Sequence, residues 1–115
     1  MFKTYELSLN RVHDSIVIKE GGERLKLTVN GDAMRMVAGL NTAQKKMLEL
    51  DDNAPDEEVK SIAEYFAAVI FGQDQAKALM DFYAGDPACV INVCGRYFRE
   101  RLANRIADVQ KKMKL

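Results

Sequence analysis

The side chains best suited to nucleophilic, redox or metal chemistry are few in this chain. Its 115 residues include one histidine, His13, and two cysteines, Cys89 and Cys94. On a helix the two thiols would point about 140° away from each other and lie ~7.5 Å apart along the axis, so a disulfide between them would break the helix. No CxxC pair occurs, so neither a zinc site nor a Cys/His nucleophile can be assembled. We expect both cysteines to be reduced and buried, as is typical of a cytoplasmic protein.

Motifs for catalysis and for nucleotide binding are absent as well. The sequence contains no GxxxxGK[ST], GxGxxG, GxSxG or HExxH. A serine nucleophile would have only His13 as its base, and His13 is expected in a loop between two strands. The acidic run Asp56-Glu57-Glu58 follows Pro55, where carboxylates favour the positive end of a helix dipole, so it is interpreted as a helix start. We therefore expect no enzyme, no catalytic residue, no cofactor and no metal site.

The charges balance over the chain but are unevenly distributed. Seventeen Lys and Arg residues match 17 Asp and Glu residues. Residues 51–86 carry nine acidic and two basic side chains, a net charge of −7, whereas residues 87–115 carry seven basic and two acidic ones, a net charge of +5. Within one molecule these segments either face each other or lie solvated side by side; alternatively, they join acidic to basic faces between copies.

A run of basic residues within residues 87–115 is a candidate nucleic-acid-binding face. It consists of Arg96, Arg99, Arg101 and Arg105, interrupted by Glu100 and Asp108. A neutral chain lacks the basic footprint that nucleic-acid binding requires. We interpret the run as a solvated, salt-bridged face and expect no nucleic-acid partner.

The composition is that of a folded, helix-rich domain. Hydrophobic residues make up 48% of the chain and charged residues 30%, with two prolines and no tryptophan. No stretch approaches the ~18 apolar residues of a membrane span, and the residues from Met1 to Glu6 lack the apolar core of a signal peptide. We expect one soluble domain over residues 1–115, with a β-sheet in 1–30 and helices in 31–115.

The first 30 residues alternate between apolar and polar side chains. This pattern predicts strands over residues 4–9, 15–19 and 24–29. The last two flank Gly21-Gly22, and glycine at both positions suits the positive φ angles of a type I′ hairpin turn. We expect a three-stranded antiparallel meander whose apolar face is covered by helices.

The two-residue turn also predicts the hairpin register. It places Ile18 opposite Leu25 and Ile16 opposite Leu27. All four apolar side chains then lie on one face.

Helical spacing begins after the strands. Helices are predicted over residues 33–50, 56–71 and 74–84, with Asp32 as the N-cap of the first. The first helix carries a stripe whose spacing favours an intramolecular packing face over a free coiled coil: Ala33, Met36, Leu40, Ala43, Met47 and Leu50. Gly39 weakens this helix and marks either a close helix contact or a kink.

The last helix is predicted to be the longest. It begins at Asp86-Pro87 and runs about 25 residues, roughly 38 Å. Its apolar stripe consists of Val90 or Ile91, Cys94, Phe98, Leu102, Ile106, Val109 and Met113. A domain of this size has a radius of gyration near ~13 Å, so we expect the end with Lys111, Lys112 and Lys114 to project from the body.

The predicted fold class is therefore α+β and mainly helical. An N-terminal antiparallel β-hairpin or three-stranded meander is followed by about four α-helices. Five methionines either fill gaps in the core or line an adaptable binding groove: Met34, Met36, Met47, Met80 and Met113.

A family resemblance begins in the helical part, over residues 63–113. Its segments, in order, are Phe66–Gly72, Gln75–Leu79, Phe82–Asp86, Val93–Phe98 and Ile106–Lys112. This pattern resembles the short form of the small tail assembly chaperones of siphophages and prophages of Gram-positive bacteria. The N-terminal hairpin followed by a helix resembles theirs too.

The resemblance implies binding rather than catalysis. Such chaperones coat the long helical tape measure protein, keep its apolar heptads from aggregating, and are displaced from the finished tail. It implies a homo-oligomer in the host cytoplasm, absent from the mature virion, with the tape measure protein and the tail tube protein as partners, and with no membrane partner. The candidate partner-binding residues are Phe71, Phe82, Tyr83, Tyr97 and Phe98, each of which has core packing as its alternative role.

The same features also suit a second interpretation. A small dimeric prophage adaptor or regulatory protein, acting through its long C-terminal helix, would have the same Met-rich helices and segregated charge.

Overall fold

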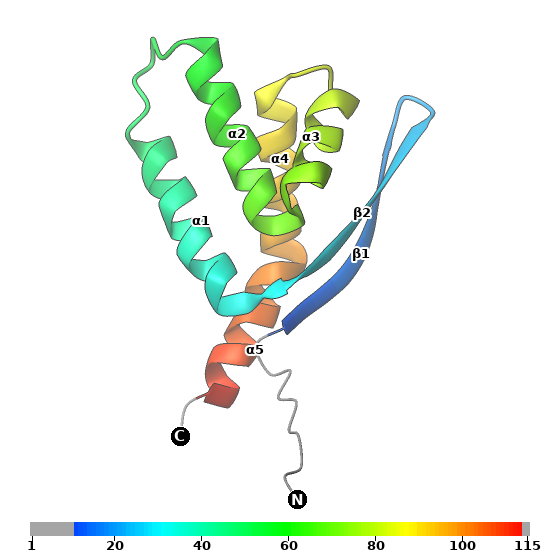
Figure 1. Cartoon of the computed structure of the whole chain (residues 1–115), viewed down its shortest axis with the longest axis vertical. Helices are drawn as coiled ribbons and strands as arrows, with labels where there is room; N and C mark the ends of the chain where they lie inside the picture. The colour runs from blue at the N-terminus through cyan, green and yellow to red at the C-terminus, as the bar shows by residue number, and fades with distance from the viewer. Residues whose placement is uncertain (1–10, 114–115) are drawn as a thin grey trace, which may run out of the picture.

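The computed structural model describes residues 11–113, with side chains as far as Lys111. A β-hairpin is followed by a set of helices, which confirms an α+β, mainly helical fold (Figure 1). The elements are β1 (Arg11–Glu20), β2 (Glu23–Asp32), α1 (Ala33–Leu48), α2 (Asp56–Phe71), α3 (Gln73–Phe82), α4 (Pro87–Tyr97), the π-helical turn η1 (Phe98–Leu102) and α5 (Ala103–Met113). The hairpin stands at one side of the helices, and its tip extends away from them (Figure 1).

The hairpin has the predicted register. Ile18 pairs with Leu25 and Ile16 with Leu27, in an antiparallel ladder that continues without a bulge from the turn to Arg11 and Asp32. The turn glycines both have positive φ, as a two-residue hairpin turn requires. The strands are longer than predicted, and the β-sheet extends to Asp32 rather than ending at residue 30.

One sequence prediction is corrected in β1, and another lies outside the described residues. His13 was expected in a loop between strands, but it is an exposed residue of β1, opposite Asn30. Because the ladder continues past the predicted start at residue 15, no loop forms there. The strand predicted over residues 4–9 falls in the part of the chain that the structure does not describe.

Helix α1 starts where its cap predicts. The Asp32 side chain accepts hydrogen bonds from the backbone N–H groups of Met34, at 2.8 Å, and Arg35, at 3.2 Å. Its predicted stripe faces inward, with Ala33, Met36 and Ala43 buried. Gly39 marks a close helix contact: a Cβ atom there would lie 2.8 Å from both Cγ atoms of Val69 on α2.

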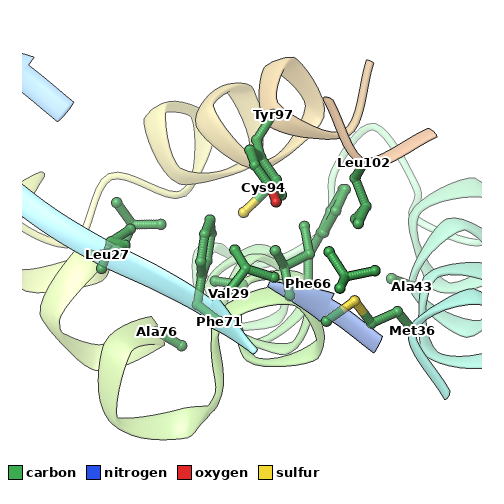
Figure 2. Packing of buried hydrophobic residues seen from close by; sticks show 14 of the residues in the cluster. Leu27, Val29, Met36, Ala43, Phe66, Phe71, Ala76, Cys94, Tyr97 and Leu102 are labelled. Carbon is green, nitrogen blue, oxygen red and sulfur yellow. The ribbon is translucent and has the colours of Figure 1, made fainter. Parts of the chain in front are cut away.

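The core lies between the inner face of the hairpin and the helices (Figure 2). It draws buried side chains from nearly every element, among them Leu27 and Val29 of β2, Met36 of α1, Phe66 and Phe71 of α2, Ala76 of α3, and Cys94 and Tyr97 of α4. Both cysteines are unbridged, as predicted, although Cys89 is only half-buried. Burial raises the pKa of the Cys94 thiol to about 12, so it stays protonated.

The last helix is not the single regular helix that the stripe predicted. α4, η1 and α5 form one continuous rod, but Phe98–Leu102 is π-helical (Figure 1). The buried residues of the rod are Val90, Cys94, Tyr97, Leu102, Ile106 and Val109. Tyr97 and Leu102, the buried residues on either side of the π turn, are therefore five positions apart. Tyr97 therefore takes the buried place predicted for Phe98, because a π turn inserts one residue into the helical phase.

The C-terminal part of the rod carries two residues of the predicted apolar stripe, Ile106 and Val109. Lys111, predicted to lie on the projecting end, is exposed, and the side chains of Lys112 and Lys114 lie outside the described part of the chain. Ile106 and Val109 are buried, and α5 contacts α1. The helix therefore belongs to the body of the molecule at least as far as Val109. Within residues 11–113, no helix is both long and apolar enough to cross a membrane.

Candidate helix-binding groove

The five aromatic residues predicted to bind a partner do not form one site. Phe71 ends α2 and Tyr97 ends α4; both are buried, with ring centroids 5.8 Å apart. Both side chains belong to the core, as Figure 2 shows.

Phe82 and Tyr83 form a second location at the end of α3. Their rings meet edge to face, with centroids 5.1 Å apart, and both are half-buried. Tyr83 also lines a cleft beside β1, together with Val93 of α4.

Phe98 lies at a third location, and there the structure opens an apolar groove. The groove runs between α1 and the η1–α5 part of the rod and has a volume of about 190 Å³. It is lined by Val37, Leu40, Asn41, Phe98, Ala103, Ile106, Ala107 and Gln110. We call it the α1–α5 groove. Asn41 and Gln110 supply its only amide side chains, and none of its lining residues is charged.

The outer side of α1 carries two exposed apolar side chains near its two ends. Met34 is 40% exposed and Leu48 is 79% exposed. They lie at the ends of a series spaced by three and four residues: Met34, Val37, Asn41, Gln44 and Leu48. Helical residues at this spacing share one face, which is the pattern with which a second helix packs. An amphipathic helix laid along α1 would place its apolar side chains in the α1–α5 groove.

The groove residues other than Phe98 were missed by reasoning from sequence. Only the stripe of α1 that begins at Ala33 was predicted as a packing face. A second stripe begins at Met34 and lies beside the first on the helix. The wall contributed by Ile106 and Ala107 depends on how α5 packs on α1, which no local pattern specifies.

An ion pair holds the hairpin to the middle of the rod. Asp14 of β1 accepts hydrogen bonds from Arg101, 2.7 Å from Nε and 3.2 Å from Nη2, and from the Tyr97 hydroxyl at 3.3 Å. Burial alone would raise the pKa of Asp14, but the hydrogen bonds from Arg101, Ser15 and Tyr97 and the charge of Arg101 lower it below its ordinary value. Burial and the neighbouring Asp14 raise the pKa of Tyr97 to about 12.

The clefts beside the hairpin mix charged and apolar side chains. The cleft at the base of the hairpin, about 530 Å³ in volume, mixes Arg11, Arg35 and Asp32 with apolar side chains. Among the described side chains, no three His, Cys, Asp or Glu residues gather closely enough to hold a metal ion. Within the described part of the chain, the α1–α5 groove differs from the clefts beside the hairpin in having no charged lining residue.

Comparison of the chain with protein-family models, with curated proteins and with solved structures found no match.

Proposed function

We propose that this chain is a non-catalytic tail assembly chaperone, which binds the long helical tape measure protein of a phage or prophage and keeps it from aggregating. The α1–α5 groove is the observation that carries the proposal. It is an uncharged, mainly apolar groove between two helices, and the exposed apolar side chains of Met34 and Leu48 lie near the ends of α1 beyond it. The resemblance of residues 63–113 to this chaperone family supports the same function.

The groove accounts for such an activity in physical terms. A tape measure helix exposes apolar residues every three or four positions until the tail tube surrounds it, and the groove shields such residues from water. Each Leu or Ile side chain buried there contributes at most about 1.5–3 kcal/mol. Binding per copy is therefore weak and reversible, and coating depends on many copies along one partner. Weak contacts also suit a chaperone that acts in the host cytoplasm and dissociates before the virion is complete.

The alternative is a dimeric adaptor or regulator acting through the last helix. That function needs an apolar stripe on α5 that faces outward. Ile106 and Val109, the central residues of the stripe, are instead buried within the same chain. The chaperone is therefore the function that we favour.

Co-expression with the tape measure protein from the same phage tests the proposal. We expect the long protein to remain in the soluble fraction only with this chain present, and to copurify with many copies of it. Ala107→Glu places a charge on an exposed position of the groove wall, so we expect it to reduce binding at least about tenfold. Asn104→Glu adds the same charge on an exposed position of α5 that does not line the groove, and should bind normally.

Two results would contradict the proposal. One is a tape measure protein that stays insoluble, or fails to copurify, with the wild-type chain. The other is equal binding by the Ala107→Glu and Asn104→Glu variants, which would place the helix somewhere other than the groove.

A further inference from the structure

Positive charge is concentrated on the two helices that form the α1–α5 groove, although the whole chain has a net charge of zero. Every charged residue of α1 is basic, and α5 has a single carboxylate. By contrast, α2 and α3 carry mostly acidic residues. The basic residues are Arg35, Lys45 and Lys46 on α1, and Arg105, Lys111 and Lys112 on α5. The groove is thus uncharged inside, while the helices on both sides of it are basic.

Helical spacing places one of these cations beside each wall. Asn41 lines the groove on α1, and Lys45 follows it by four residues. Ala107 lines the groove on α5, and Lys111 likewise follows it by four residues. Residues at this spacing are neighbours on one face of a helix, with Cβ atoms about 5–6 Å apart. Both lysines are exposed and neither lines the groove, so they stand at its border.

Other charged groups near the groove are engaged elsewhere or lie on another side of their helix. The ammonium of Lys46 lies over the ring of Tyr65 on α2, 5.5 Å from its centroid. Glu100 is bound to Arg96, at 3.0 Å. Asp108 directly follows Ala107, and successive helical residues lie about 100° apart around the axis, so Asp108 is turned away from the groove. The ion pairs among the described side chains involve neither Lys45 nor Lys111.

The two lysines lie toward opposite ends of the groove. Helices α1 and α5 run in opposite directions (Figure 1), and each lysine is near the C-terminal end of its own helix. A helix lying along the groove would therefore pass a cation near each of its ends. The screening length is about 8 Å at physiological ionic strength, so charges one helical turn from the groove still act on such a partner.

We propose that the α1–α5 groove selects amphipathic helices whose apolar stripe is flanked by acidic residues. This inference rests on the proposed function, because it takes a helix as the ligand of the groove and specifies the charge of that helix. The apolar lining provides contact area but does not discriminate between amphipathic helices. Lys45 and Lys111 discriminate, since they attract carboxylates beside the stripe and repel lysines in the same places.

Two synthetic helical peptides test the selection. Each has three heptads, about 21 residues, with leucine at both seam positions. One peptide has glutamate at every flanking position and the other has lysine there, so like charges keep each peptide from pairing with itself. Fluorescence anisotropy at about 0.1 M salt measures the two dissociation constants. We expect the glutamate peptide to bind at least about fivefold more tightly, with a ratio that approaches one as salt rises to about 0.5 M.

Matched charge reversals show whether the two lysines are responsible. The double variant Lys45→Glu, Lys111→Glu should invert the preference, so that the lysine peptide binds more tightly. The control is the double variant Lys26→Glu, Lys77→Glu. It makes the same change in net charge at exposed positions of β2 and α3, outside the groove. Its ratio of dissociation constants should stay within about twofold of the wild-type ratio.

The outcomes separate this inference from the proposed function. Equal binding of both peptides, weakened alike by Ala107→Glu, overturns the selection and leaves the groove as a helix-binding site. Binding of neither peptide, or tighter binding of the lysine peptide, also overturns the selection, whereas co-expression with the tape measure protein decides the chaperone function. A preference for glutamate that both double variants retain, or that both lose equally, overturns the selection because charges elsewhere then produce it.

Discussion

At the scale of single residues, Asp14 joins the hairpin to the rod. It lies on β1, caps the Ser15 N–H, and binds Arg101 and Tyr97 of the rod. Its side chain is only 16% exposed, whereas that of Arg101 is 63% exposed, so solvent screens the pair in part. Asp14 is thus the polar link between a hairpin and a helix that otherwise meet through apolar contacts.

The lowered pKa of Asp14 gives this link a pH dependence. A carboxyl whose pKa is lower in the folded chain adds stability above its unfolded pKa, and that stability is lost as pH falls through the folded value. We expect Asp14→Asn to reduce the free energy of unfolding by about 1 kcal/mol at neutral pH. The difference from the wild type should shrink at pH values below the ordinary carboxyl range, in urea titrations at several pH values.

Asp108→Asn serves as the control, because Asp108 is an exposed carboxylate of α5. It should change stability by less than about 0.5 kcal/mol at any pH. An Asp14→Asn difference that persists unchanged in acid would show that the link is not electrostatic.

At the scale of the elements, two helical glycines have opposite roles. Gly39 lets α1 approach α2, since a Cβ there would lie 2.8 Å from the branched end of Val69. Gly95 on α4 has a different environment, because a Cβ there would meet only the terminal Nη1 of Arg99, at 3.2 Å. Arg99 is an exposed, flexible side chain that can move aside.

We therefore expect alanine to have opposite effects at the two positions. Gly39→Ala gains up to about 1 kcal/mol of helix propensity but loses more to overpacking, for a net destabilisation of about 1 kcal/mol. Gly95→Ala should stabilise the chain by about 0.5–1 kcal/mol. Thermal and urea unfolding of the two variants measure both effects, and equal stabilisation by both would mean that α1 and α2 do not pack closely at Gly39.

Local sequence patterns predict some of the helices and strands of this chain and not others. The hairpin register, the Asp32 cap and the inward stripe of α1 follow from alternation, turn chemistry and spacing, and all three were predictable. The π turn was not recognised, although the steps from Cys94 through Phe98 and Leu102 to Ile106 are each four residues long. Such a stripe drifts around a regular helix by about 40° per step. The α1–α5 groove, apart from Phe98, could not be predicted, because it arises where residues 60 positions apart meet.

At the scale of the whole molecule, the charges are separated along the body. The acidic residues Asp51, Asp52, Asp56, Glu57 and Glu58 are exposed around the start of α2, at the end of the molecule opposite α5 (Figure 1). α5 carries the exposed basic residues Arg105 and Lys111. The ion pairs among the described side chains, Arg96–Glu100 and Arg101–Asp14, do not join the acidic segment to the basic one.

This separation leads to a prediction about salt. If the acidic end of one copy meets the basic end of another, the apparent mass at low ionic strength should fall as salt rises to about 0.5 M. The double variant Glu57→Lys, Glu58→Lys should remove the salt-sensitive part of the mass. Light scattering across a salt series measures this, and a mass that does not change with salt rules out association through the charged ends.

The π turn has a consequence for how the rod is used. One extra residue in a helical turn rotates everything after it by about 100° relative to a regular helix. Without that rotation, the face continuing from Tyr97 would carry Arg101, Arg105 and Asp108, and the Ile106–Val109 stripe would turn away from α1. The stripe would then be exposed, in the position that dimerisation through the last helix requires. A single inserted residue thus decides whether the end of this chain is one wall of its own groove or a surface for another molecule.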